Sequence, residues 1–262
     1  KLVATAVDKA GKDGAITIEE SRSVNTSLDI IEGFRLEAGY AASAFVTDER
    51  RGAAHYASPL ILVTDNRIDN VDQILPALEV VSRDGRPLIL VAEEIEGQAL
   101  AALIMNTVRG TMKIAAIKAP FYGERRRAIL EDLALSTGAE FVCRESTTRL
   151  KDIKLKHFGQ ARSIDITKVS TTIIGGKGDF AAIDKRIELL KKELQSLDEL
   201  RECDKVQERI TKLASGVAVI NVGAPTEVEM TEKKHRIEDA LEAVKSAQQE
   251  GIVPGGGVAL IR

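Results

Sequence analysis

Between Pro59 and Val142, short apolar runs alternate with stretches that repeat apolar residues at helical spacing. The apolar runs occupy 60–64, 88–92, 113–118 and 140–143, and the helical stretches between them cover about 70–83, 97–109 and 123–136. Buried strands that alternate with helices are typical of a parallel sheet covered by helices. This pattern predicts an α/β domain.

The two ends of the chain follow different patterns. At the N-terminal end, residues 1–10 have helical spacing, and 15–18 and 27–33 are extended. After the central block, strands are predicted at 163–167, 171–174 and 217–222. Helices are predicted over 179–213, with a break near 196–204, and over 232–250. The simplest interpretation is a second domain built from both ends. The predicted fold is therefore α/β, with a parallel-containing sheet flanked by helices and a smaller discontinuous α+β domain.

Composition narrows the function classes. Of the 262 residues, 44% are hydrophobic and 29% charged, which is typical of a globular protein. Aromatic residues make up only 3%, without Trp, and the net charge is −3, so base stacking and a general attraction to phosphate are disfavoured. The longest apolar strings fall well short of the ~18 residues of a membrane span. We expect neither a nucleic acid nor a membrane as partner.

Cys143 and Cys203 lie far apart and form no CxxC unit. This usage fits a reducing compartment rather than a disulfide framework or a zinc site. The three histidines, at 55, 157 and 235, lack metal-ligand spacing and are predicted to lie on the surface.

Two of the predicted helices are unusually apolar. The string Ala99–Met105 surrounds the whole axis of the helix at 97–109, and the helix at 70–83, capped by Asn70, carries a wide apolar stripe. Either both helices are deep core, or they expose a contiguous apolar patch, which on a globular protein marks a binding surface. The pattern leaves both interpretations open.

Three further motifs have ordinary interpretations. Gly176–Ala181 matches the dinucleotide pattern GxGxxA, but no strand with a terminal acid follows about 20 residues later, so we interpret it as a glycine turn. The run 125–127 is three arginines beside acidic residues at 124, 131 and 132, which is typical of a solvated first helical turn. Asp239 lies beside the predicted buried stripe of the last helix, formed by Ile237, Ala240, Leu241 and Val244, and is expected to be a solvated charge.

Several strings together resemble one family. They are Gly11–Glu20, Glu93–Gly97, Lys118–Pro120, Gly216–Ile220, Ala224–Met230, Glu238–Leu241 and Gly255–Leu260. With these strings the chain resembles, from end to end, a subunit of the group I chaperonins, the GroEL family. The resemblance implies an apical domain at 32–217, an intermediate domain at 1–31 and 218–249, and a stub of the equatorial domain at 250–262.

The resemblance also implies a molecular chaperone. In that family the two apolar helices bind non-native polypeptides and then a GroES-type co-chaperonin, and the subunits assemble into a ring in the bacterial cytoplasm or an organelle matrix. Carried over by position, the implied binding residues are Tyr40, Phe45, Leu75, Leu78, Leu100, Ile104 and Met105. A nucleotide-independent holdase or partner-binding module remains the alternative.

By the same resemblance, Asp239 orients the water that attacks ATP, and Gly256 lines the nucleotide pocket. ATP and Mg²⁺ are the cofactors implied for the full-length parent. Because the family's phosphate loop and its other catalytic acid lie outside this chain, we expect no tight binding of either cofactor by this chain alone.

The chain departs from the family pattern at three places. A basic residue of the family is Ala38 here, a binding aromatic is Ala44, and Phe121 interrupts a glycine-containing turn. These departures bear on client affinity, subunit pairing and dependence on the co-chaperonin.

Overall fold

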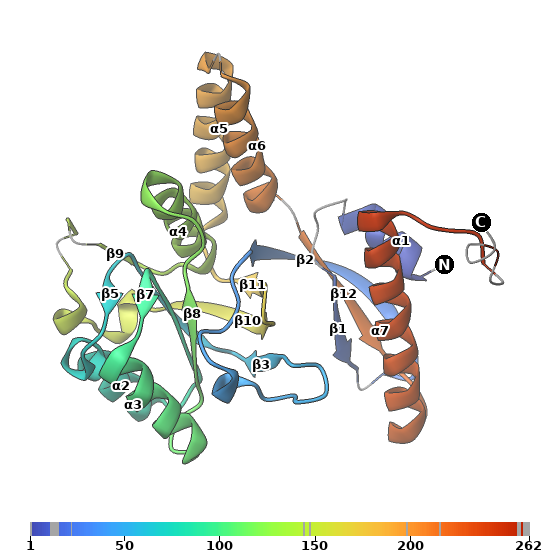
Figure 1. The fold of residues 1–262 in the computed structure, drawn as a ribbon, viewed down its shortest axis with the longest axis horizontal. Helices are drawn as coiled ribbons and strands as arrows, with labels where there is room; N and C mark the ends of the chain where they lie inside the picture. The colour runs from blue at the N-terminus through green and yellow to red at the C-terminus, as the bar shows by residue number, and fades with distance from the viewer. Residues whose placement is uncertain are drawn as a thin grey trace. The chain divides into compact units, whose positions relative to one another are not determined.

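The computed structural model describes residues 2–10, 16–21, 23–143, 145–146, 148–197, 199–214, 216–255 and 258. These residues form two compact units, a small unit (1–31 with 217–262) and a large unit (32–216), drawn in Figure 1. Each unit has its own hydrophobic core.

The large unit is built on a mixed sheet. Its strands are β2 (Ser27–Leu36, from Glu32 on), β3 (Ala54–Ala57), β4 (Leu60–Thr64), β6 (Leu88–Ala92), β8 (Ile114–Lys118), β9 (Phe141–Val142), β10 (Gly159–Ile166) and β11 (Thr171–Gly176). Strands β4, β6, β8 and β9 run parallel, whereas β10 pairs antiparallel with β3, β4 and β11, and β11 pairs antiparallel with β2. Every residue of β4 and β6 is buried, as continuous apolar strands predict. The predicted α/β class is confirmed.

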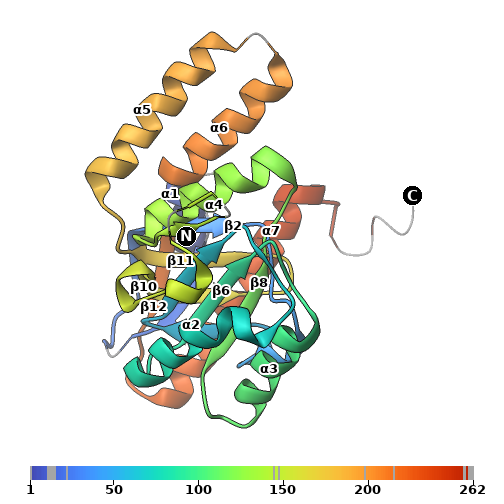
Figure 2. The same ribbon diagram turned by 90° about the vertical axis from the view of Figure 1, so that its left-hand side faces the viewer.

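Three helices cover the parallel strands: α2 (Val71–Asp84), α3 (Gly97–Val108) and α4 (Gly123–Thr137). The chain steps from β4 to β6 to β8 in one direction, so right-handed crossovers place α2 and α3 on the same face. The two helices contact each other, and Figure 2 shows them near one end of the strands. After α4 the chain returns to β9, beside β4.

A helical hairpin projects from the large unit (Figure 2). It consists of α5 (Phe180–Ser196) and α6 (Leu200–Ala214), whose facing side chains Leu190, Val206 and Ile210 form a small core. The predicted glycine turn precedes it: a Cβ on Gly178 would lie 2.2 Å from the carbonyl oxygen of Leu135. Because α6 follows α5 in place of a strand, the dinucleotide pattern has no βαβ unit here.

The small unit packs helices on a short parallel pair of strands. Strand β1 (Ile16–Glu20) pairs with β12 (Gly216–Val222), and α1 (Leu2–Ala10) and α7 (Glu227–Glu250) contact β1. Helix α7 begins five residues before the predicted start, because the Thr226 hydroxyl caps it by accepting the N–H of Glu229 at 3.3 Å. Within the expected stripe of this helix, Leu241 is buried but Ala240 is exposed.

Two surface predictions can be compared with the structure. The prediction of a solvated turn at 125–127 is wrong: all three arginines are half-buried, and they pair with acids distant in the sequence, namely Glu208, Glu93 and Glu145 in turn. The prediction for His157 is wrong: it is 6% exposed, because its ring closes the turn that begins at Lys154. Both cysteines are free thiols. Among the described residues, no helix is long and apolar enough to cross a membrane.

Candidate polypeptide-binding surface

Hydrogen bonds join the start of α3 to the segment that precedes α2. Each helix follows one strand of a short parallel pair, β5 (Arg67–Ile68) and β7 (Glu94–Ile95). Beyond this pair, the N–H of Glu96 donates to the Ile68 carbonyl at 3.0 Å and the N–H of Ala99 donates to the Asp69 carbonyl at 3.1 Å. The start of α3 is therefore held by the loop that leads into α2.

Helix α2 has defined ends. The Asn70 side chain accepts the N–H of Asp72 at 3.2 Å, and the Gln73 side chain accepts the N–H of Asn70 at 3.2 Å, which completes a capping box. At the other end Gly85 takes a left-handed φ of 80° and donates its N–H to Val81 at 2.8 Å. The predicted cap at Asn70 is confirmed.

Helix α2 is an ordinary amphipathic helix with one exception. Its buried side chains are Ile74, Ala77, Leu78 and Val81. Its exposed positions are polar or charged, apart from Leu75, which is 45% exposed. For most of α2, then, the core interpretation is correct, and Leu75 alone presents a large apolar side chain.

Helix α3 differs, because its outer face is apolar. Ala99 and Leu103 are buried against the sheet, and Leu100 and Ile104 are half-buried at the sides. The exposed positions Ala101, Met105 and Val108 follow at intervals of four and three residues, the spacing of one helix face. Met105 is 49% and Val108 70% exposed. We call these three residues the apolar stripe.

Phe45 does not lie on this surface, contrary to the expectation. It belongs to a 3₁₀ turn (Ser43–Phe45) that packs against α3 and β8, and it is fully buried. Beside it, the hydroxyl of Tyr56 lies 3.1 Å from the Phe45 carbonyl and 3.2 Å from the Ile114 carbonyl, and burial raises the pKa of Tyr56 to about 12. Phe45 thus supports α3 from below.

The other implied binding residues also include both buried and accessible side chains. Leu78 is only 7% exposed, so its place on an exposed surface is also wrong. Tyr40 is half-buried and donates its N–H to the Thr167 carbonyl at 3.3 Å. Leu75, Leu100, Ile104 and Met105 remain at least partly accessible, on two helices that touch. Val108 was missed, although it lies four residues after Ile104 and its helical spacing could have indicated it.

A charged group lies at the start of the two helices. Arg67 pairs with Glu96 and lies 3.9 Å from Glu94, and Lys118 pairs with Glu94 at 2.7 Å. The hydrogen bond from Lys118 lowers the pKa of Glu94. Because these groups are exposed, we expect each pair to add little stability.

The departures from the family pattern have structural counterparts. Phe121 has a left-handed φ of 64°, a conformation in which a bulky residue is strained. Its ring lies 3.6 Å below the Arg125 guanidinium, which itself pairs with Glu208 of α6 at 2.7 Å. Ala38 is buried, and its carbonyl accepts the hydroxyl of Thr171 at 2.6 Å, while Ala44 is half-buried.

The residues implied for the nucleotide lie in the small unit. Asp239 is exposed on α7, where a carboxylate can contact water, and Gly256 lies outside the described residues. The described residues contain no group of three acidic, His or Cys side chains that could hold a metal ion.

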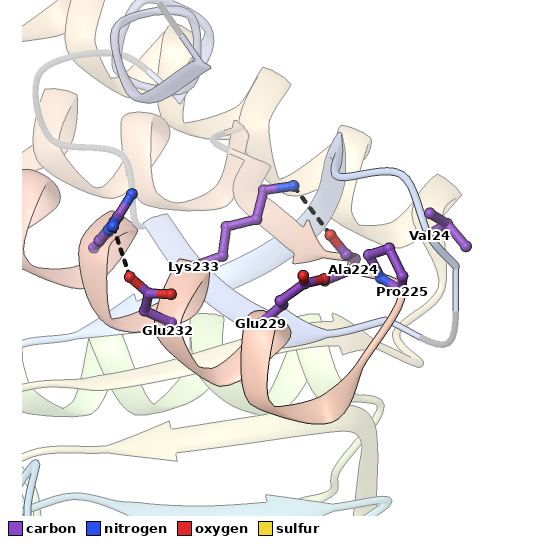
Figure 3. Close-up of a pocket in the computed structure, with 8 residues that line it drawn as sticks. Val24, Ala224, Pro225, Glu229, Glu232 and Lys233 are labelled. Atoms are coloured by element: carbon purple, nitrogen blue, oxygen red, sulfur yellow. Dashed lines mark hydrogen bonds and ion pairs between the residues drawn. The ribbon is translucent and has the colours of Figure 1, made fainter.

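A hollow lies at the start of α7 (Figure 3). Val24 and Pro225 line it together with Glu229, Glu232 and Lys233. Its cations already have partners: Lys233 donates to the Gly223 carbonyl at 3.0 Å, and Arg236 pairs with Glu232 at 2.6 Å. Both cations of the hollow are therefore already engaged within the protein.

The comparison with known families gives a match over most of the chain. Residues 64–262 match the model of the TCP-1/cpn60 chaperonin family, and this range covers α2, α3, the hairpin and α7. A chaperone role and oligomeric assembly with polypeptide substrates are general features of such a family. Because the match covers three quarters of its length, the chain belongs to the TCP-1/cpn60 chaperonin family.

Proposed function

We propose that the chain binds non-native polypeptides through the apolar stripe of α3 together with Leu75, Leu100 and Ile104. The observation that carries this proposal is the outer face of α3, where three successive exposed positions are apolar. Exposed apolar faces of this kind are rare on monomeric proteins unless they bind something.

The chemistry suits clients of many sequences. Burial of one apolar side chain contributes roughly 1.5–3 kcal/mol without requiring a defined partner residue. Met105 adds an unbranched, adaptable side chain. Several copies of the surface in an oligomer would raise the affinity through avidity, although each copy binds weakly.

The wider proposal follows the family. In a full-length ring, the large unit acts as the apical domain, which holds clients and later a GroES-type co-chaperonin, and the small unit acts as most of the intermediate domain. Asp239 then serves an ATP- and Mg²⁺-dependent cycle, and Gly256 lines the nucleotide pocket. We place the protein in a bacterial cytoplasm or an organelle matrix.

Client binding is tested by aggregation of a denatured protein in the presence of this chain. The test variant is Met105→Ser with Val108→Ser. The matched control is Leu189→Ser with Val169→Ser, because these two apolar residues are 51% and 74% exposed elsewhere on the large unit. We expect the wild type and the control to suppress aggregation and the test variant to lose most of that effect.

Circular dichroism confirms that each variant is folded. Equal suppression by the folded test variant and the wild type would contradict the proposed surface. The holdase alternative is tested with the full-length parent: release of a bound client on addition of ATP supports the cycle, and retention supports a holdase.

A further inference from the structure

The segment 148–158 combines buried apolar side chains with exposed cations. Leu150, Ile153 and Phe158 are at most 8% exposed and anchor two 3₁₀ turns, Leu150–Asp152 and Leu155–His157. The side chains that alternate with these anchors are exposed and basic, namely Arg149, Lys151, Lys154 and Lys156. We call these four residues the basic surface.

Hydrogen bonds fix the conformation of this segment. The ring Nδ1 of His157 accepts the N–H of Lys154 at 3.1 Å, and the N–H of His157 donates to the Lys154 carbonyl at 2.9 Å. The N–H of Glu140 in turn donates to the His157 carbonyl at 3.0 Å. The backbone that carries the cations is therefore defined before any partner binds.

The cations of the basic surface lack acidic partners within the described part of the chain. This distinguishes them from the arginines at 125–127, each of which forms an ion pair. Asp152 is the single acid in the segment, against four cations, although the chain as a whole carries a net charge of −3. The surface is thus a local positive region on an acidic protein.

Two hollows adjoin at Lys151. One, of about 490 Å³, is lined by Asn66, Arg67, Gln73, Cys143, Arg149, Leu150 and Lys151. The other, of about 410 Å³, is lined by Thr148, Lys151, Asp152, Ile153, Lys154, Lys156 and His157. No carboxylate lines the first hollow, and the Gln73 carbonyl already accepts the N–H groups of Asp69 and Asn70, which leaves its NH₂ as a donor. Asp152 lines the second hollow, and Glu140 lies 3.8 Å from His157 at its edge, so the first hollow suits the carboxylates of a partner better than the second.

The basic surface borders the apolar helices. Gln73 of α2 lines the first hollow, and the turn Leu150–Asp152 packs against α2, which in turn contacts α3. We propose that the basic surface binds an acidic segment of a polypeptide whose apolar part lies on α2 and α3. This inference rests on the proposed function and adds a preference for clients with acidic residues next to an apolar stretch.

A peptide suits this surface better than a nucleic acid does. Stacking of bases needs accessible aromatic faces, and Phe158, the aromatic residue of the segment, is only 3% exposed. Leu155, in contrast, is 42% exposed among the cations and offers an apolar contact to a peptide side chain.

The test uses three labelled peptides with one apolar core, flanked by Glu, by Lys or by Gln residues, and measures their affinities by fluorescence anisotropy. For the wild type in dilute salt we expect the Glu-flanked peptide to bind about tenfold more tightly than the Lys-flanked one. The preference should shrink severalfold at about 0.5 M salt, because screening weakens exposed charges.

The test variant is Arg149→Glu with Lys151→Glu, and its matched control is Lys191→Glu with Lys192→Glu on the exposed face of α5. We expect the test variant to lose or reverse the preference and the control to keep it. Arg149→Gln with Lys151→Gln should fall between them, and circular dichroism verifies that all variants are folded.

The outcomes separate the two proposals. Equal affinities for the Glu- and Lys-flanked peptides, or a preference that survives in the folded test variant, would overturn the inference while binding of the Gln-flanked peptide upholds the proposed function. Binding of the Glu-flanked peptide alone, lost in the test variant, would support the basic surface and count against the apolar stripe. Displacement of the acidic peptide by an RNA oligonucleotide that binds more tightly would overturn the assignment to a peptide.

Discussion

Helix α3 and the hairpin α5–α6 differ in where most of their apolar residues lie, although the hairpin also exposes Phe180 and Leu189. In the hairpin the two helices face each other, so Leu190, Val206 and Ile210 form a core between them. Helix α3 has more apolar positions than its inner face can bury, and Met105 and Val108 remain outside. The comparison teaches that exposure on α3 follows from its sequence: an apolar string that surrounds the axis leaves part of itself outward in any rotation.

The largest loss of stability is expected on substitution of Asp132, which lies where the hairpin packs against α4. Asp132 is 1% exposed and accepts Arg209 Nε at 2.7 Å and Arg186 Nε at 3.1 Å. Asp132→Ala would leave two guanidinium groups without this acceptor and should lower the free energy of unfolding by about 3–5 kcal/mol. Urea denaturation measures the loss, and hydrogen exchange should show it first in α5 and α6.

The control for this substitution is Glu145→Ala. Glu145 pairs with Arg127 at 2.7 Å, but its side chain is 74% exposed, so the free energy of unfolding should stay close to that of the wild type. Equal losses for the two variants would show that burial does not set the strength of the hairpin junction.

Within α3, we expect the buried residues to set stability and the exposed residues to set client binding. Leu103→Ala removes a fully buried side chain and should cost about 2–5 kcal/mol. Met105→Ala changes an exposed residue and should stay within about 0.5 kcal/mol of wild type while it weakens client binding. Urea denaturation and peptide anisotropy measure the two effects. A large stability loss for Met105→Ala would mean that the stripe is part of the core.

A smaller, pH-dependent change in the free energy of unfolding is expected from Tyr56, which lies beside Phe45 beneath α3. Burial raises the pKa of Tyr56 to about 12, so between pH 10 and 12 the unfolded chain releases this proton while the folded chain retains it. This contribution to stability is therefore complete below pH 10 and is lost as the pH rises through 12, by about 3 kcal/mol in all.

The comparison variant is Tyr56→Phe, which lacks the hydroxyl. Its unfolding free energy should start lower, because the hydrogen bonds to the carbonyls of Phe45 and Ile114 are gone, and should fall less steeply above pH 10. Parallel curves for wild type and variant would contradict the assignment of this pH dependence to Tyr56.

Much of the fold was predictable because its signals are local. The strands β4, β6 and β8, the cap at Asn70 and the glycine turn before α5 follow from apolar runs and turn residues within a few positions. The strands β5 and β7 were missed because two residues are too short for any periodicity to appear. The start of α7 was missed because the cap at Thr226 lies before the apolar pattern begins.

The candidate site was predictable only in part. The helical spacing singled out α2 and α3, but it could not distinguish Phe45 and Leu78, which are buried, from Met105, which is exposed. The basic surface escaped notice because its cations alternate with buried anchors along two 3₁₀ turns, whose period of three residues differs from that of a helix or a strand.

The sequence by itself determined the alternation of strands and helices, the α/β class and the excess of apolar residues on α3, because each of these depends on spacing along the chain. The tertiary structure decided which apolar side chains face outward and which cations gather beside α2. Burial depends on the elements that pack against a residue, and those elements come from distant parts of the sequence. Phe45 is covered by α3 and β8, whereas Met105 and Val108 lie on the side of α3 that faces away from the sheet.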